Sequence, residues 1–318
     1  MKLVSFVIPC YCSEKTIASV LDEIRGAMQG LPQYAYEVIL VNDGSPDNTF
    51  ETLRALANSD CHVTAIDLAR NFGQQSAIMA GLSHSSGDYV VCLDDDGQTP
   101  ADEVGKLLGR LERDDCDVAM ASYEHKQHSA FRNFGTKVNN LMTEIMLGKP
   151  KDLTTTSYFA MKRFIVDEML NYTHCYPYLD GLLLRSTRRI CTVPVQHRAR
   201  TVGSSGYTLG KLFSLWMDGF TAFSVKPLRL ASVFGALTAL AGFIYAVFIV
   251  IRHFIDSTVP IGWSSTMALQ LVLGGIILLV LGLAGEYIGR IYMCINAAPQ
   301  YVVRQVKGPA GHESRGGQ

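Results

Sequence analysis

The chain has 318 residues, which is enough for one large domain or two ordinary ones. Its 28 basic and 29 acidic residues give a formal net charge of −1, so no overall positive field indicates a nucleic-acid partner. The eight cysteines lack metal-site spacing and several lie in apolar runs, which predicts reduced, mostly buried thiols in a cytosolic compartment.

Strands and helices are predicted to alternate along the first 121 residues. Short apolar runs that end in polar or turn-forming residues predict strands at residues 3–8, 37–42, 63–67, 89–93 and 118–121. Helices are predicted between them, at residues 14–28, 46–58, 74–83 and 102–112. This alternation predicts a mostly parallel, open α/β sheet, in which ligands bind outside the carboxyl ends of the strands.

The strand predicted at residues 89–93 ends in three adjacent aspartates, Asp94, Asp95 and Asp96. Three carboxylates repel one another, so a divalent cation with positions left for phosphate oxygens is one explanation. A fully solvated acidic turn is the other. Because side chains alternate along an extended segment, Asp94 and Asp96 should point one way and Asp95 the other. Gln98 shares the parity of Asp96 if the extended shape continues.

Polar side chains also follow the first three predicted strands: Tyr11 and Glu14, then Asp43, then Asn71. Any one of them alone suits a turn or a helix cap, but their joint placement at one edge favours a ligand site. The chain has neither GxGxxG nor GxxxxGK[ST], so a bound nucleotide would need another partner for its phosphates. A metal on the aspartates would supply it, and Asp43 and Glu14 could accept hydrogen bonds from the base or ribose.

Two charge-free apolar stretches, residues 230–251 and 264–285, lie in the C-terminal third of the chain. Each has 22 residues and would be about 33 Å long as a helix, which matches the hydrocarbon core of a bilayer. The loop between them carries one Arg, whereas five basic residues flank the pair: Lys226, Arg229, Arg290, Arg304 and Lys307. This asymmetry predicts a transmembrane hairpin with both termini, and an N-terminal domain, in the cytoplasm.

The first 230 residues or so resemble a family 2 glycosyltransferase of the GT-A fold. The matching motifs are VIPCY at residues 7–11 with Glu14, NDGS at 42–45, NFG at 71–73 with Ala77 and Gly81, GD at 87–88 and DDDGQTP at 94–100. With the hairpin, the whole chain resembles the polyprenyl-phosphate glycosyltransferases. That family includes dolichyl-phosphate mannose synthase, the bactoprenol glucosyltransferases and the undecaprenyl-phosphate formamido-arabinose transferases.

The resemblance implies roles for the polar residues at the strand ends. Asp94, Asp96 and Gln98 would hold Mg²⁺ or Mn²⁺, with the two aspartates as a catalytic D-x-D pair. The donor nucleotide would lie against Pro9, Tyr11, Glu14, Asp43, Asn71 and Asp95.

Two basic segments are candidates for the acceptor phosphate. Residues 129–147 carry Arg132 among apolar residues at helical spacing, which fits an amphipathic surface helix or, by resemblance, a helix beside a lipid phosphate. Residues 197–207 carry Arg200 in a Gly- and Ser-rich loop that suits an anion and is similar to the family's R-x-x-G-x-S-K-Y segment. Residues 207–227 are predicted to lie in the membrane interface. The predicted organisation is a GT-A domain at 1–206, that interfacial segment, two transmembrane helices at 228–291 and a cytoplasmic tail at 292–318.

The chain departs from the family pattern at several positions. Cys12 stands where the family usually has Asn, and Asp95 and Gly97 stand where it usually has Ala and Leu. Gly206 replaces the usual Lys of the basic loop, which removes one phosphate contact. An Arg that is usual near Phe159 is absent, which indicates a different acceptor or sugar pocket.

The predicted reaction is an inverting, metal-dependent transfer of a sugar from a nucleoside diphosphate sugar, UDP by preference, to polyprenyl (undecaprenyl) phosphate. It would take place at the cytoplasmic face of the cell inner membrane, for cell-envelope glycan synthesis or modification. The acceptor phosphate is already anionic at neutral pH, so it needs positioning more than deprotonation. Asp180, in an apolar stretch, is either a general base or a helix-start residue.

Other functions remain open at this stage. The chain could be a catalytically silent membrane protein that binds a nucleotide sugar, or a glycosyltransferase with a different lipid or glycan acceptor. A processive polysaccharide synthase is disfavoured because the Q-x-x-R-W motif is missing, and a transporter because neither apolar stretch carries an ionisable residue. Relatives indicate assembly into homo-oligomers, and Gly274, Gly275 and Gly282 permit close helix packing.

Overall fold

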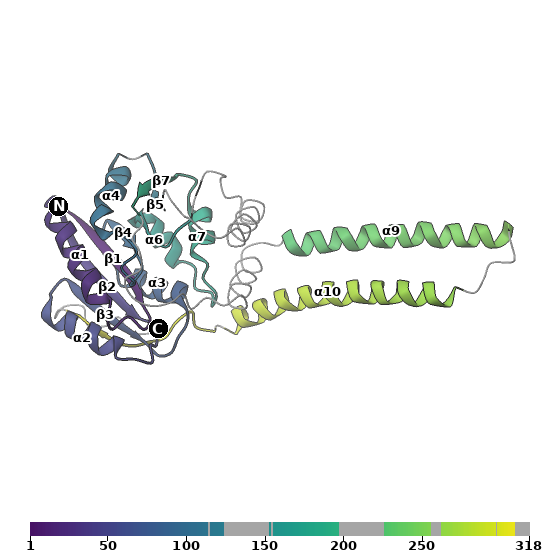
Figure 1. Ribbon diagram of the computed structural model, residues 1–318, viewed down its shortest axis with the longest axis horizontal. Coiled ribbons are helices and arrows are strands. Elements are labelled where there is room, and N and C mark those ends of the chain that lie inside the picture. Colours follow the sequence, from purple (N-terminus) through teal and green to yellow (C-terminus); the bar gives the residue numbers. More distant parts are fainter. Residues whose placement is uncertain are drawn as a thin grey trace. The chain divides into compact units, whose positions relative to one another are not determined.

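The protein is shown in Figure 1 as a computed structural model that describes residues 1–113, 115–123, 153, 155–196, 226–255, 262–296 and 298–308. The chain divides into two compact units, Met1–Leu212 with Ala297–Gln318, and Phe213–Asn296. The segments predicted at residues 129–147 and 197–207, and nearly all of the predicted interfacial segment, lie outside the described residues.

The described part of the first unit is built on an eight-stranded sheet in the order β7-β5-β6-β4-β1-β2-β3-β8. Its strands are β1 (Lys2–Cys10), β2 (Tyr34–Asn42), β3 (Val63–Leu68), β4 (Tyr89–Cys92), β5 (Val118–Tyr123), β6 (Phe159–Lys162), β7 (Ile190–Val195) and β8 (Val303–Lys307). Neighbouring strands are parallel, with three exceptions: β6 is antiparallel to both β4 and β5, and β8 is antiparallel to β3. The predicted mostly parallel α/β sheet is confirmed.

Helices cover both faces of this sheet (Figure 1). One face carries α1 (Ile17–Gln29), α2 (Thr49–Ser59), η1 (Ala101–Glu103) and α4 (Val104–Glu112), and the other carries α3 (Gln74–Ser83), α6 (Arg163–Leu170) and α7 (Leu179–Ser186). The apolar residues of α1 recur at helical spacing and are buried against alternate residues of β1, such as Phe6 and Ile8. Burial on both faces explains why the central strands are almost continuously apolar.

Two helices begin later than the sequence predicts. α1 begins at Ile17 rather than residue 14, and α2 at Thr49 rather than residue 46. Ser45, which resembles a helix cap in the sequence, instead accepts a hydrogen bond at 3.1 Å from the backbone N–H of Cys12. The residues before both helices therefore belong to two loops that bind each other, and this tertiary contact overrides the local capping preference.

The chain returns to the sheet after the second long helix, which the sequence analysis did not predict. β8 runs antiparallel to β3 at the sheet edge, with Val306 opposite Ile66. Gln300, which is 9 % exposed, donates from its side-chain amide to the backbone carbonyls of Tyr172 and His174 at 3.3 and 2.9 Å. Residues 298–308 are thus an integral part of the first unit.

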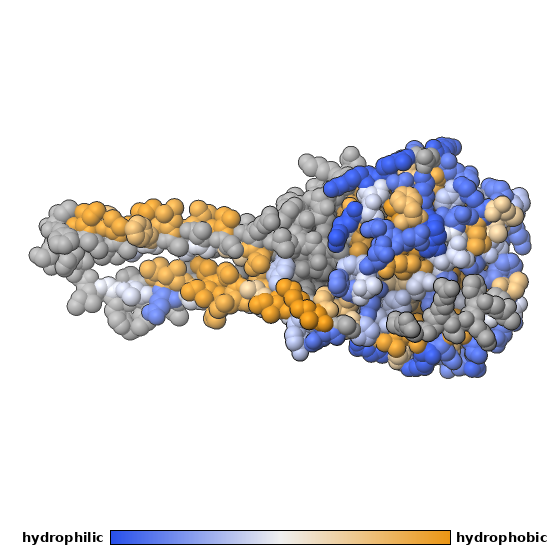
Figure 2. All heavy atoms as spheres, turned by 180° about the vertical axis from the view of Figure 1, so that it is seen from behind, coloured by the Kyte–Doolittle hydropathy of each residue, from blue (hydrophilic) through white to orange (hydrophobic). Residues whose placement is uncertain are grey.

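The second unit is a hairpin of two long helices, α9 (Lys226–Ile255) and α10 (Trp263–Ile295). Their described side chains are largely hydrophobic and exposed, as Figure 2 shows. Within the described residues, one stretch, Leu273–Ile295, is long and apolar enough to cross a membrane, with a mean hydropathy of 1.6 and none of it buried. The predicted C-terminal two-helix hairpin is confirmed.

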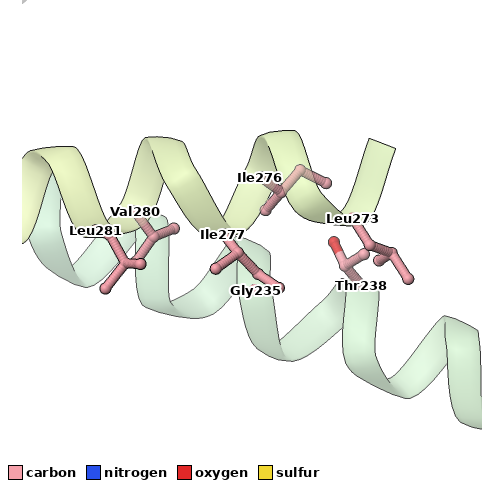
Figure 3. Close-up of a pocket in the computed structure, with 7 residues that line it drawn as sticks. All are labelled: Gly235, Thr238, Leu273, Ile276, Ile277, Val280 and Leu281. Atoms are coloured by element: carbon pink, nitrogen blue, oxygen red, sulfur yellow. The ribbon is translucent and has the colours of Figure 1, made fainter. Parts of the chain in front are cut away.

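An apolar groove lies between the two helices of the hairpin (Figure 3). Its volume is about 370 Å³. Its lining is Gly235 and Thr238 of α9 with Leu273, Ile276, Ile277, Val280 and Leu281 of α10.

The cysteines differ from the prediction in one respect. Cys116 and Cys191 form a disulfide, with Cα atoms 5.7 Å apart, because they enter the neighbouring parallel strands β5 and β7. The prediction of reduced thiols is therefore wrong for this pair. Among the others, Cys10 and Cys92 are buried, whereas Cys12 is exposed.

Candidate functional site

The candidate site lies where β1, β2, β3 and β4 end at the same edge of the sheet. Their registers place the last residues side by side, with Cys10 opposite Asn42 and Asn42 opposite Asp67. The loops after these strands carry most of the polar residues that the sequence analysis singled out. The sheet therefore brings together groups that are distant along the chain, such as Tyr11 and Asp95, which are 84 residues apart.

Asp94 and Asp95 face different partners, as the alternation of an extended segment predicts. The carboxylate of Asp94 accepts hydrogen bonds from the Gln74 side-chain amide, at 2.9 Å, and from the Ser157 hydroxyl. The carboxylate of Asp95 turns toward the loop after β1, where it accepts from the Tyr11 backbone N–H at 3.1 Å and from the Ser13 hydroxyl. Asp95 thus connects the acidic loop to the loop that carries Tyr11.

The extended shape ends at Gly97. Its φ of 72° lies in the left-handed region, which glycine adopts without a steric penalty. The backbone N–H of Gln98 folds back to donate to the Asp96 carboxylate at 3.0 Å. The extended shape that would point Asp96 and Gln98 to the same side does not continue through Gly97. A turn, not strand alternation, places Gln98 beside Asp96.

Negative charge is concentrated at this loop. The pKa of Asp94 is raised to about 6: burial is the main cause, the charges of Asp96 and Asp95 add to it, and the hydrogen bonds from Ser157 and Gln74 act against it. Burial also raises the pKa of Asp95, against the lowering effect of its bonds to Ser13 and Tyr11. Both shifts arise mainly from burial and to a lesser extent from repulsion between the aspartates, and a nearby cation would stabilise the charged form of each carboxylate.

The acidic loop fits a hard divalent cation held by few protein ligands. Asp94 and Asp96 offer carboxylate oxygens, the ligands that Mg²⁺ and Mn²⁺ prefer, whereas Asp95 is turned away. Among the described residues, Asp60, Cys61 and His62 are three metal-binding side chains that converge, whereas no such group of three lies at this loop. A cation here would therefore complete its coordination with water or with ligand oxygens, as Mg²⁺ does on phosphates.

Asp43 joins two loops of the site. Its two carboxylate oxygens accept hydrogen bonds from the backbone N–H groups of Phe72 and Gly73, at 2.7 and 2.9 Å. The residue is 3 % exposed, and burial raises its pKa, against the lowering effect of these two bonds. The sequence predicted only a ligand contact for Asp43, whereas the structure gives it a role in fixing the loop before α3.

The other predicted nucleoside contacts lie in the same loops with different exposure. Tyr11 is 51 % exposed. Asn71 is also exposed, and it directly precedes Phe72, whose backbone N–H binds Asp43. Glu14 is half-buried and accepts a hydrogen bond from the Asn48 backbone N–H at 3.3 Å. Pro9 is buried inside β1, opposite Val41. Tyr11 and Asn71 are therefore the exposed side chains of this set.

Cys12 has a φ of 57° and is the one non-glycine residue with positive φ among the described residues. Asn adopts this left-handed conformation more readily than most residues, because its short polar side chain can bond locally. The family preference for Asn at this position therefore has a backbone explanation. The departure at Cys12 changes the strain of the loop rather than a ligand contact.

Three polar partners of the aspartates were not predicted from the sequence: Gln74, Ser157 and Ser13. Gln74 is the first residue of α3 and directly follows the loop after β3, so its position in the sequence could have indicated a place at the strand-end edge. Asp180 lies in the first turn of α7, which favours the helix-start explanation over a general base. Arg132 and Arg200 lie outside the described residues.

A mostly parallel sheet with helices on both faces and an acidic loop at its carboxyl edge, followed by an apolar two-helix hairpin, defines a glycosyltransferase of the GT-A fold with a C-terminal hairpin. The chain belongs to glycosyl transferase family 2, which matches residues 5–170, and the GtrB C-terminal hairpin family matches residues 226–291.

Relatives extend the match over nearly the whole chain. The undecaprenyl-phosphate 4-deoxy-4-formamido-L-arabinose transferase of Yersinia pestis (strain Pestoides F) is 37 % identical over 311 residues, 97 % of this chain and 94 % of that one. The protein of that name from Yersinia enterocolitica is 36 % identical with the same coverage. Among solved structures, Mycobacterium tuberculosis glucosyl-3-phosphoglycerate synthase with Mn²⁺, UDP-glucose and phosphoglyceric acid shares the fold, with a TM-score of 0.52, 21 % identity and coverage of 68 % and 76 %.

Proposed function

We propose that the protein transfers a sugar from a nucleoside diphosphate sugar to polyprenyl phosphate at the cytoplasmic face of the cell membrane. One observation carries the proposal: an acidic loop that contains Asp94 and Asp96, at the strand-end edge of a GT-A sheet, and a C-terminal two-helix hairpin occur together in this chain. The chain is also 37 % identical, over 97 % of its length, to enzymes named undecaprenyl-phosphate formamido-arabinose transferases.

The donor is a nucleoside diphosphate sugar, with UDP as the first nucleotide to test. Tyr11, Glu14, Asp43 and Asn71 surround the nucleoside, while Asp94 and Asp96, with Gln98, hold Mg²⁺ or Mn²⁺. When bound, the cation neutralises the diphosphate leaving group. A protein that shares this fold was solved with Mn²⁺ and UDP-glucose, which supports the choice of probe.

The protein residues have positioning as their main task. Asp95 holds the loop that carries Tyr11 against the acidic loop, and Asp43 holds the loop before α3. A phosphate acceptor needs no strong base, because it is already anionic at neutral pH. We assign its contacts to Arg132 and Arg200, and we propose a single displacement that inverts the anomeric carbon.

The hairpin anchors the enzyme where its lipid acceptor lies. We propose that residues 228–291 cross the membrane twice, that residues 207–227 lie at its surface and that both termini are cytoplasmic. The apolar stretch at Leu273–Ile295 and the basic residues outside the hairpin support this topology. Residues 1–206 form the catalytic domain, and the tail at 292–318, whose first residues continue α10, adds β8 to it.

Membranes that contain the Asp96→Ala protein provide the test, with radiolabelled nucleoside diphosphate sugars and extraction of the lipid fraction. We expect the label in polyprenyl-linked sugar to fall by at least about a hundredfold, because the cation loses one of two carboxylate ligands. The matched control is Asp22→Ala, which removes a 71 % exposed carboxylate on α1. Unchanged labelling by Asp96→Ala with every donor would refute the proposal, and donor binding without turnover by the unaltered protein would favour a silent binding protein.

A further inference from the structure

The segment that follows α10 makes a specific contact at the carboxyl end of β3. Arg304, in β8, donates from one guanidinium nitrogen to the Asp67 carboxylate at 3.0 Å and from the other to the Ala69 carbonyl at 2.7 Å. The backbone N–H of Ala69 in turn donates to the Val302 carbonyl at 2.8 Å. The planar fork of an arginine suits this double contact, which a lysine can make only in part.

The first partner of Arg304 leads to the end of β2. Asp67 is buried, and its second oxygen accepts a hydrogen bond at 2.7 Å from the side-chain amide of Asn42, its register neighbour. The side-chain oxygen of Asn42 accepts from the Ser45 backbone N–H at 3.3 Å. Arg304, Asp67 and Asn42 thus form a continuous polar chain that ends at the loop of residues 43–45.

The second partner of Arg304 leads to the same place by another route. Ala69 begins the loop that supplies the backbone N–H groups of Phe72 and Gly73, and these two groups bind both oxygens of Asp43. Two separate paths from Arg304 therefore meet at Asn42 and Asp43. Neither Arg304 nor Asp67 belongs to the acidic loop or to the motifs that define the donor site.

We propose that Arg304 is a positioning residue of the donor pocket, through which the segment after the hairpin fixes the ends of β2 and β3. The inference rests on the proposed function for the identity of the ligand, a nucleoside diphosphate. The Arg304 side chain is 60 % exposed, so its ion pair contributes little to overall stability. Its removal leaves the buried Asp67 carboxylate with less compensation, and the effect should therefore be local to these loops.

The chain offers a matched control at the opposite end of β3. Arg25 binds Asp60 with two nitrogens, at 3.0 and 2.7 Å, and the Asp60 side chain is 11 % exposed. Asp60 precedes β3, whereas Asp67 lies at its carboxyl end, so the two pairs are similar in chemistry and differ in place. Each arginine makes two hydrogen bonds, Arg25 both to Asp60 and Arg304 one to Asp67 and one to the Ala69 carbonyl, so the loss of two arginine hydrogen bonds alone should affect both variants alike.

The test compares purified full-length Arg304→Ala, Arg304→Lys and Arg25→Ala proteins by amide hydrogen exchange without ligand and by steady-state kinetics. In Arg304→Ala we expect faster exchange at Phe72 and Gly73, and a donor KM raised on the order of tenfold with kcat changed less than about twofold. Arg304→Lys should recover part of both effects, and Arg25→Ala should show neither.

The inference would be overturned if the Phe72 and Gly73 amides of Arg304→Ala exchanged at the same rate as in the wild-type protein. It would also be overturned if Arg25→Ala accelerated their exchange equally. An unchanged donor KM in Arg304→Ala would overturn it as well. The exchange measurement separates this inference from the proposed function. If the unaltered protein transferred no sugar, the proposed function would fail. The exchange rates of the two amides would still show whether Arg304 holds the loops in place.

Discussion

Gly44 provides a sharp test of how the loops of the site fit together. It follows Asp43, and its φ is 58°, in the region that residues with a side chain rarely adopt. A Cβ atom at this position would lie 2.4 Å from the carbonyl carbon of Arg70 and 2.5 Å from the nitrogen of Asn71. Both are backbone atoms, so a side-chain rotation cannot relieve the clash.

The cost of Gly44→Ala follows from these two features. The left-handed conformation costs an alanine roughly 1–2 kcal/mol, and an extra methyl group in a closely packed place costs roughly 1–3 kcal/mol. We therefore expect the free energy of unfolding to fall by about 2–5 kcal/mol. The loop of residues 70–73 must also move, which weakens its two hydrogen bonds to Asp43. The donor KM should rise for that reason.

The assay is denaturant unfolding of the purified protein in detergent, followed by donor kinetics at a temperature where the variant is folded. Gly109→Ala is the control: Gly109 lies inside α4, and an added Cβ would meet nothing within 4 Å. That change should be neutral or stabilise the protein by up to about 1 kcal/mol. If Gly44→Ala were as stable as Gly109→Ala and kept the wild-type donor KM, the account of these loops would be wrong.

Two further changes test the strain and the charge of the site. Cys12→Asn should raise the free energy of unfolding by up to about 1 kcal/mol, because Asn adopts the φ of 57° more readily; equal or lower stability in denaturant unfolding would contradict the strain argument. In metal-free protein the folded state binds the Asp94 proton more tightly than the unfolded state, because burial raises the pKa of Asp94 from 3.8 to about 6. Its contribution to stability is therefore full below about pH 4 and is lost as the pH rises through 6, by roughly 3 kcal/mol. Unfolding curves of Asp94→Asn should lack this fall, and identical pH profiles for the two proteins would refute it.

Much of the fold and of the site follows from local patterns. The apolar runs give the five strands from β1 to β5 because strands buried on both faces are nearly continuously apolar. The acidic loop could be predicted because Asp94, Asp95 and Asp96 directly follow one of these apolar runs. Parallel strands bring their carboxyl ends to one edge, so Asp43 and Asp94 could be placed together without a structure.

The missed features depend on contacts between distant parts of the chain. β8 is a short edge strand whose alternating polar residues resemble a solvated tail, and it is defined by its pairing with β3, more than 230 residues earlier. The disulfide of Cys116 and Cys191 likewise depends on the adjacency of β5 and β7. The helix start expected at Ser45 failed because Ser45 binds Cys12 of another loop. No local pattern encodes these three pairings.

The most direct test of the central claim is sugar transfer by the purified protein to undecaprenyl phosphate, with a panel of nucleoside diphosphate sugars, in the presence of Mn²⁺ and after its removal by a chelator. The account predicts a lipid-linked product from at least one donor, its loss on chelation and its recovery on addition of Mn²⁺ or Mg²⁺. A product that forms equally well without a divalent cation, or no product from any donor, would contradict it.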